Sequence, residues 1–185
     1  MKATKLQAYA FLRKHSAKLA AAAVAVVALS LLLGTSITAM AAIIGLIAVA
    51  AFSTFYFNYV SLPINFELVK LSTILVAYTQ GIAAGLVVGV LSTIIGKVLI
   101  GRIDERLPIS VAAISAVAVL AGLFSGADIT VLGTGLAALY SASMFAISMM
   151  LGGDLGWNLP YEGSSFLINF VLFTRIAPLI LPLLQ

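Results

Sequence analysis

The longest stretch without a charged residue, residues 19–66, constrains the fold of this chain more than any other feature. Its 48 residues contain no Asp, Glu, Lys or Arg. A hydrocarbon core roughly 30 Å thick is crossed by about 20 apolar residues in a helix, so this stretch is long enough for two crossings. Further uncharged stretches lie between Lys70 and Lys97, Arg106 and Asp128, Asp128 and Asp154, and Glu162 and Arg175. The pattern predicts a membrane protein with several spans.

Composition supports the same class. The chain is 63% hydrophobic and only 9% charged, whereas soluble domains are about 25% charged. In lipid every backbone N–H and C=O must be paired internally, so only helices and closed barrels are stable there. The apolar stretches show no alternation of period two, which excludes a barrel. We therefore expect an all-α, polytopic transmembrane helix bundle.

The N-terminal residues 1–18 differ from the rest because basic side chains gather there, while the net charge of the whole chain is +4. We interpret residues 1–18 as a basic interfacial segment and residues 19–185 as a single transmembrane domain. Basic residues beside an apolar run favour a multi-pass protein of the cell membrane with its N-terminus in the cytoplasm. They do not form the folded basic face that nucleic acid binding needs, so no nucleic acid partner is expected.

The charge map predicts seven spans, with six as the alternative if residues 66–101 cross the membrane once. Seven spans place Lys97, Arg102 and Arg106 on the same side as the basic N-terminus, as the positive-inside rule favours. The expected spans are 19–34, 37–59, 66–80, 82–100, 109–126, 129–151 and 164–184.

Several classes of chemistry lack the residues that they need. The chain has no cysteine and a single histidine, His15, so disulfides, thiolate nucleophiles and iron–sulfur clusters are excluded. No nucleophile or metal-binding motif occurs, and an intramembrane enzyme needs a paired acid, a histidine or a serine–histidine group. We expect a protein that is not an enzyme, with no catalytic residue, no metal and no cofactor.

Small residues recur every fourth position in three of the expected spans. Such stripes let helices approach closely, either inside one bundle or against a partner subunit. Both interpretations stay open from the sequence. The stripes comprise Gly81, Gly85 and Gly89, then Ala118, Gly122 and Gly126, and finally Ala138, Ala142 and Ala146.

Arg175 lies near the middle of the last expected span. A charge at mid-bilayer costs at least about 2.5–3.5 kcal/mol, so we expect it to face the bundle interior and to have a partner. It is a hypothetical anion-binding or gating charge; a structural ion pair or snorkelling to the interface is the alternative. The candidate substrate-binding residues are Arg175, Asn169, Gln80, Glu67 and Lys70.

Two local interactions follow from spacing. Glu67 and Lys70 are three residues apart and meet on one helical face, either as a local ion pair or in a polar cavity with Tyr78 and Gln80. Asp128 stands where a helix N-cap belongs.

Residues 152–163 form a polar segment that contains Asp154, Trp157, Asn158, Tyr161 and Glu162. Trp and Tyr commonly anchor a turn at the membrane interface. A cap over a ligand site is the alternative interpretation of the same residues.

From Tyr56 onward the chain resembles the substrate-binding S components of energy-coupling-factor vitamin transporters. The resemblance lies in the segment 61–66 (SLPINF) after the aromatic end of a span, in the segment 78–89 (YTQGIAAGLVVG), and in Asn169 of the closing span. It implies a six-helix bundle that binds a small vitamin under capping loops and docks on a transmembrane partner through small-residue helix faces. Residues 19–34 would be an additional helix relative to that family.

Two functions are therefore expected as alternatives. The first is binding or transport of a small solute, as the substrate-binding subunit of a transporter. The second is a non-catalytic structural subunit of a larger membrane complex. The expected partners are the lipid bilayer, other membrane subunits or a second copy of the chain, and a small-molecule ligand.

Overall fold

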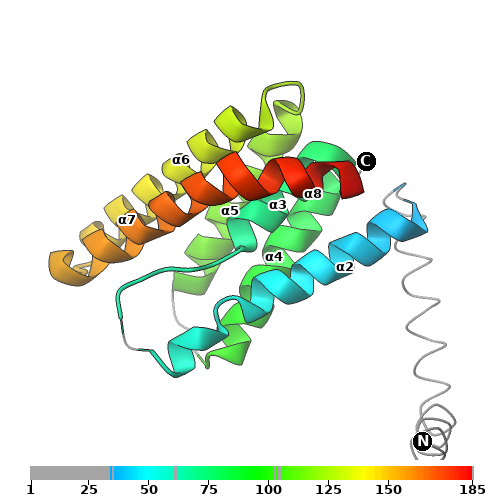
Figure 1. Ribbon diagram of the computed structural model, residues 1–185. Coiled ribbons are helices and arrows are strands. Elements are labelled where there is room, and N and C mark those ends of the chain that lie inside the picture. Colours follow the sequence, from blue (N-terminus) through cyan, green and yellow to red (C-terminus); the bar gives the residue numbers. More distant parts are fainter. Residues whose placement is uncertain (1–33, 35, 61, 102, 104–105, 185) are drawn as a thin grey trace, which may run out of the picture. The chain divides into compact units, whose positions relative to one another are not determined.

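The computed structural model describes residues 34, 36–60, 62–101, 103 and 106–184, and every regular element within them is a helix (Figure 1). The chain divides into two units, Met1–Met40 and Ala41–Gln185, and the packing below is that of the second. The helices are α2 (Ile37–Phe52), α3 (Val69–Gln80), α4 (Ile82–Leu99), α5 (Arg106–Leu123), α6 (Ile129–Met150), α7 (Leu155–Val171) and α8 (Ala177–Leu184), with the shorter η1 (Phe55–Asn58) and η2 (Leu172–Ile176).

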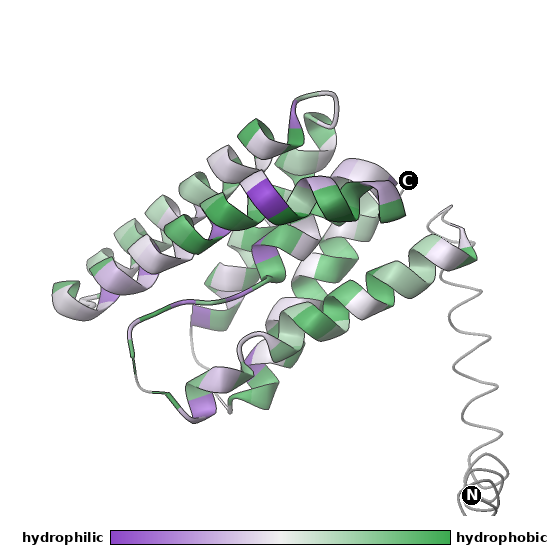
Figure 2. Cartoon of the chain, viewed as in Figure 1, coloured by the Kyte–Doolittle hydropathy of each residue, from purple (hydrophilic) through white to green (hydrophobic). Residues whose placement is uncertain are grey.

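Five helical segments in the described part of the chain are long and apolar enough to cross a membrane, with mean hydropathies of 1.5 to 2.2. Hydrophobic residues cover most of their length (Figure 2). The chain is thus a multi-pass membrane protein by the length and composition of its helices. The basic segment 1–18 and the expected span at 19–34, apart from Gly34, lie outside the described residues, and the total of seven spans stays a prediction. The five segments are Ile37–Asn58, Ile82–Leu99, Arg106–Leu123, Ile129–Met150 and Leu155–Leu184.

Helix α3 is the centre of the bundle rather than a full span. It has 12 residues, and at 1.5 Å per residue it is about 18 Å long, which is less than the hydrocarbon thickness. All residues from Val69 to Ala77 are buried, because α4, α5, α6 and α8 pack around it. A helix that is buried on every side has no need of a polar face. The short span expected at 66–80 corresponds to this helix, which begins at Val69 and is too short for a straight crossing.

The first glycine stripe packs α4 against α3. A methyl group at Gly85 would overlap Ala77, and one at Gly89 would lie 3.0 Å from Thr73 and 3.1 Å from Ile114. Gly81 has a different role, because it joins the two helices with a φ of 89°, which favours glycine. The stripe thus serves packing inside the bundle at Gly85 and Gly89.

The second stripe is used only in part. A methyl group at Gly122 would overlap Ile82, so this glycine allows α5 to approach the start of α4. Gly126 lies beyond the end of α5, and nothing surrounds the space where its side chain would be. The expected packing role is found at Gly122 and not at Gly126.

Two aspartates begin the helices of the α6–α7 hairpin. The carboxylate of Asp128 accepts hydrogen bonds from the backbone N–H groups of Thr130 (2.9 Å) and Val131 (3.0 Å), which confirms the predicted N-cap. Asp154 caps α7 in the same way, accepting from the N–H groups of Gly156 (3.3 Å) and Trp157 (3.1 Å). Helix α7 therefore begins at Leu155, well before the expected start at Ser164. Most of the expected polar loop is the first half of a helix.

Candidate functional site

A polar pocket with a cavity volume of 190 Å³ lies at the end of the bundle where α2, α4 and α6 finish and α3, α5 and α7 begin. Such a cavity is unusual in a bundle whose helices are otherwise apolar. Its aromatic side chains are Phe57, Tyr140, Trp157 and Tyr161; its charged side chains are Glu67, Lys97, Arg106 and Glu162; its other polar side chains are Thr54, Asn65, Ser92, Thr93, Ser110, Ser148 and Asn158.

The connection from η1 to α3 brings Asn65 and Glu67 to the pocket. The backbone N–H of Asn65 donates to the Ser164 hydroxyl on α7 (2.9 Å). The Tyr56 hydroxyl donates to the carbonyl of Ile64 and accepts from the N–H of Phe66 (2.8 Å). This connection is thus held to the bundle by side chains on both sides, although it has no regular structure of its own.

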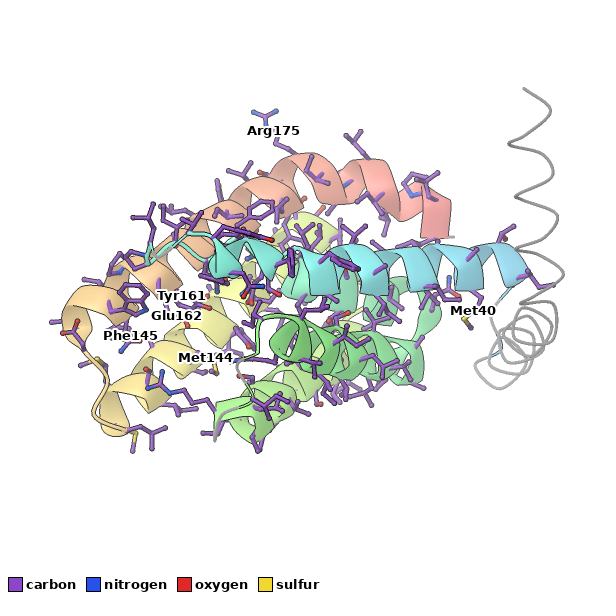
Figure 3. The ribbon with its side chains drawn as sticks, turned by 90° about the horizontal axis from the view of Figure 1, so that it is seen from below. Met40, Met144, Phe145, Tyr161, Glu162 and Arg175 are labelled. Atoms are coloured by element: carbon purple, nitrogen blue, oxygen red, sulfur yellow. The ribbon has the colours of Figure 1, made fainter. Side chains whose placement is uncertain are left out.

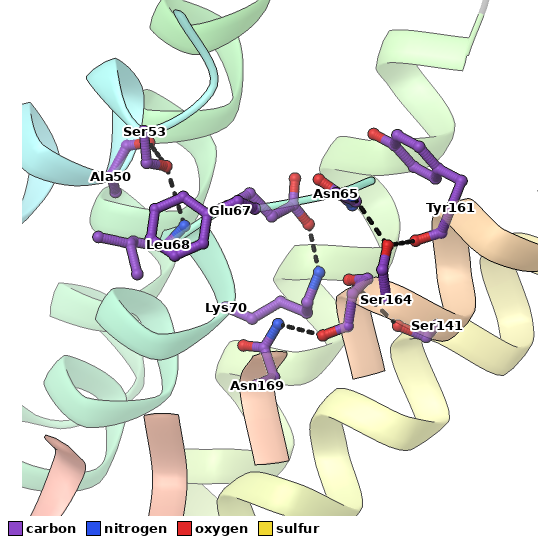
Figure 4. A network of polar contacts seen from close by, with 12 residues as sticks. Ala50, Ser53, Asn65, Glu67, Leu68, Lys70, Ser141, Tyr161, Ser164 and Asn169 are labelled. Carbon is purple, nitrogen blue, oxygen red and sulfur yellow. Dashed lines mark hydrogen bonds and ion pairs between the residues drawn. The ribbon is translucent and has the colours of Figure 1, made fainter. Parts of the chain in front are cut away.

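Glu67 forms an ion pair with Lys70, which confirms the interaction predicted from their spacing (Figure 4). The side chain of Lys70 is 0% exposed and that of Glu67 is 16% exposed. The Lys70 ammonium also lies 4.7 Å from the ring centroid of Tyr140, a cation–π distance. Because a buried charge without a partner is strongly destabilising, these two contacts explain how a lysine is kept inside the bundle.

Three buried side-chain atoms of the pocket have no hydrogen-bond partner among the described residues. They are Oδ1 of Asn65, Oγ of Ser92 and Oε2 of Glu162, half of the six atoms of this kind. Buried polar groups in proteins are nearly always paired, so each exception needs an explanation. Half of the unpaired buried atoms in the described part of the chain thus belong to residues of this one cavity.

The candidate residues Lys70 and Asn169 are not among the residues that line the pocket. Asn169 is fully buried on α7, and its amide Nδ2 donates to the backbone carbonyl of Ser165 (2.8 Å). Figure 4 shows it beside Lys70. Among the five candidate substrate-binding residues only Glu67 lines the pocket itself.

Gln80 and Arg175 lie away from the pocket. Gln80 is at the C-terminal end of α3, where its side chain donates to the carbonyl of Leu184. Arg175 is exposed and projects away from the helices (Figure 3). The expectation that Arg175 faces the interior of the bundle is wrong, because the turn η2 places this side chain on the outer surface of the last span.

Tyr161 and Glu162 were not among the five candidate substrate-binding residues, yet both point into the pocket from α7, opposite Met144 of α6 (Figure 3). The signal was present in the polar composition of residues 152–163. A cap over a ligand site was one interpretation of that segment, and Trp157 and Asn158 do line the pocket. Ser92 gave no signal, since a single serine in an apolar helix is common.

No group of three or more His, Asp or Glu side chains that could hold a metal ion occurs in the ranges that the structure covers. No family model, no curated protein and no solved structure matches this chain.

Proposed function

We propose that this multi-pass membrane protein binds a small solute in the pocket between Glu67, Ser92 and Glu162, as the substrate-binding subunit of a transporter. The observation that carries the proposal is the set of unpaired polar atoms that line one cavity of an apolar bundle. Polar groups inside a membrane protein are costly and typically mark a solute pathway or binding site. Ligand pockets combine apolar walls with a few converging polar groups, as here.

The resemblance to the S components of vitamin transporters supports the same function. The resembling segment 61–66 contains Asn65, and it lies in the connection that borders the pocket. The arrangement agrees with a solute site that a loop covers. We propose binding without chemical conversion, because the Glu67 carboxylate is held in an ion pair with Lys70 and is not free to act as an acid or a base.

Retention of solutes by the purified protein tests this proposal. The wild type is incubated with a defined mixture of anionic, neutral and cationic water-soluble metabolites, and retained molecules are identified by mass spectrometry after gel filtration. The variant Ser92→Leu places an apolar side chain in the cavity, since Ser92 is fully buried and lines it. We expect the wild type to retain a molecule that Ser92→Leu does not.

The neighbouring residue supplies a matched control. Leu91 is 41% exposed on the outer side of the same helix, so Leu91→Phe enlarges a side chain without filling the cavity. Circular dichroism and gel filtration establish that each variant is folded. If the wild type retains no molecule beyond those that Ser92→Leu retains, the proposed function is wrong.

A second function, that of a non-catalytic subunit of a membrane complex, is favoured by one observation. The third small-residue stripe does not pack inside the bundle, because Ala142 and Ala146 of α6 are exposed. Exposed small residues suit close contact with another membrane helix. Ala142→Leu with Ala146→Leu should abolish co-purification of a partner subunit while leaving solute retention unchanged. Unchanged co-purification would contradict this second function.

A further inference from the structure

Resting on the proposed function, we infer that the solute is a small, flat, positively charged nitrogen compound whose N–H groups donate hydrogen bonds to Asn65, Ser92 and Glu162. The inference concerns the chemical class of the solute, which the existence of a pocket does not specify. It depends on which hydrogen-bonding groups of the pocket are still open, on where its carboxylates are paired, and on the shape of its walls.

The open groups are acceptors. The amide oxygen of Asn65 accepts hydrogen bonds and cannot donate them, and the same holds for an ionised Glu162 carboxylate. Both oxygens are buried and have no partner within the described part of the chain. A solute rich in N–H donors pairs with both of them, whereas a solute that has only acceptors leaves both unpaired.

Ser92 differs from other serines of the bundle. The hydroxyl groups of Ser110 and Ser115 donate to backbone carbonyls one turn earlier, at 3.0 Å and 2.7 Å. This is the usual arrangement of serine in a membrane helix. The Ser92 hydroxyl is fully buried and has no partner in the ranges described, so it remains available to a molecule in the cavity.

The unpaired carboxylate oxygen of Glu162 favours a cation. The Glu67 carboxylate is paired with Lys70 through Oε1, and Glu162 is the pocket carboxylate with a buried oxygen that has no partner among the described residues. Lys97 and Arg106 also line the cavity, and both residues take part in other interactions. A charge-assisted hydrogen bond from a cationic nitrogen to Glu162 would be among the strongest contacts available there.

The walls of the pocket favour a flat molecule of about one ring. Phe57 and Tyr161 are stacked with their ring centroids 5.9 Å apart, and Trp157 and Tyr140 add two more aromatic surfaces. Aromatic faces attract cations, as the position of Lys70 over Tyr140 already shows within this protein. The cavity of 190 Å³ is smaller than the roughly 300–1,000 Å³ of sites for drug-sized ligands.

Two probes of nearly equal shape test the class. Benzamidine is a flat cation with N–H donors, and benzoate is a flat anion that has only acceptors. Binding is measured through the emission of Trp157, the single tryptophan of the chain and a residue of the pocket wall. We expect benzamidine to bind at least about tenfold more tightly than benzoate, the usual scale for a charged hydrogen bond.

Two variants connect the preference to the named atoms. Glu162→Gln should weaken benzamidine binding by about tenfold or more while changing benzoate binding little. Ser92→Ala removes an unpaired buried hydroxyl, so it should raise the melting temperature of the empty protein and weaken benzamidine binding. A purely structural serine would instead lower the melting temperature when removed. Ser115→Ala, outside the pocket, is the matched control and should leave benzamidine binding unchanged.

The outcomes separate this inference from the function on which it rests. Equal or tighter binding of benzoate, or benzamidine binding that Glu162→Gln leaves unchanged, overturns the cationic class while the pocket remains a solute site. No binding of either probe also overturns the class. The proposed function itself fails only if the metabolite mixture shows no molecule that the wild type retains and Ser92→Leu does not.

Discussion

The centre of the bundle and its outer surface each contain a basic residue in an apolar helix, and the two residues differ in burial and in pairing. Lys70 on α3 is completely buried, paired with Glu67 and placed over Tyr140. Arg175 in η2 is exposed on the outside of the last span. A charge in an apolar stretch is thus no guide to a binding site by itself. What matters is whether the surrounding helices enclose it, and only the charge at the centre lies next to the pocket.

Breaking the central ion pair should have the largest effect. Lys70→Met leaves the Glu67 carboxylate without its partner, and loss of one member of a buried pair costs about 3–5 kcal/mol of stability. Unfolding by SDS, followed through Trp157 emission in mixed micelles, measures the free energy.

The double variant Glu67→Leu with Lys70→Met serves as the control for this prediction. It removes both charges together and should recover most of the lost stability, since replacing a whole buried pair by apolar residues is often neutral. A cost below about 1 kcal/mol for Lys70→Met alone would show that the pair behaves like a surface ion pair, which would remove the contrast with Arg175.

A methyl group at the centre should have the next largest effect. Gly85→Ala places a Cβ against the backbone and side chain of Ala77 on α3, and overpacking of this kind costs about 1–3 kcal/mol. Gly126→Ala is the matched change at a position where nothing surrounds the new group, and it should stay within about 0.5 kcal/mol. The same SDS titration compares them, and equal effects would contradict a tightly packed centre.

The two capping aspartates distinguish the pocket end of the bundle from the opposite end. Asp154→Ala and Asp128→Ala each remove an N-cap, so each should cost about 1 kcal/mol of stability. Only Asp154 caps the helix that carries Trp157 and Glu162 into the pocket. We therefore expect Asp154→Ala, and not Asp128→Ala, to weaken benzamidine binding in the Trp157 assay. Equal weakening by both would mean that benzamidine binding depends on the overall stability of the protein and not on the position of α7.

Removal of the exposed charge should have the smallest effect. Arg175→Met should cost no stability, because it replaces an exposed charge on the outside of an apolar span by an apolar side chain. The affinity for benzamidine should be within twofold of that of the wild type. A loss of probe binding on this substitution would restore Arg175 as a solute-binding residue and overturn its assignment to the outer surface.

Predictions from neighbouring residues agreed with the structure where the interaction is local. The Glu67–Lys70 pair and the Asp128 cap depend only on helical spacing, and both were confirmed. The start of α7 was misplaced, because Pro160 and the polar residues around it are also typical of a loop. Pro160 is the sixth residue of this helix, and a proline there lacks the N–H that would pair with the carbonyl four residues earlier, which is why it favoured a loop in the sequence.

Predictions of which way a side chain faces were less successful, and Arg175 is the clear example. In a soluble helix the polar stripe marks the outside. In a membrane helix lipid and protein interior are both apolar, so the sequence has no stripe to mark either side. Glu162 and Ser92 were missed for the same reason, since their roles depend on side chains from other helices that meet them in the cavity.

By itself, the sequence determined the class of the molecule. The absence of charge over residues 19–66 and the apolar stretches after it require helices in a bilayer, because the cost of burying charge and unpaired backbone in lipid leaves no other arrangement. Only the tertiary structure decided that α3 is enclosed, that Arg175 lies outside, and that Asn65, Ser92 and Glu162 share one cavity. These facts depend on how helices rotate against one another, and hydropathy along a single chain does not contain that information.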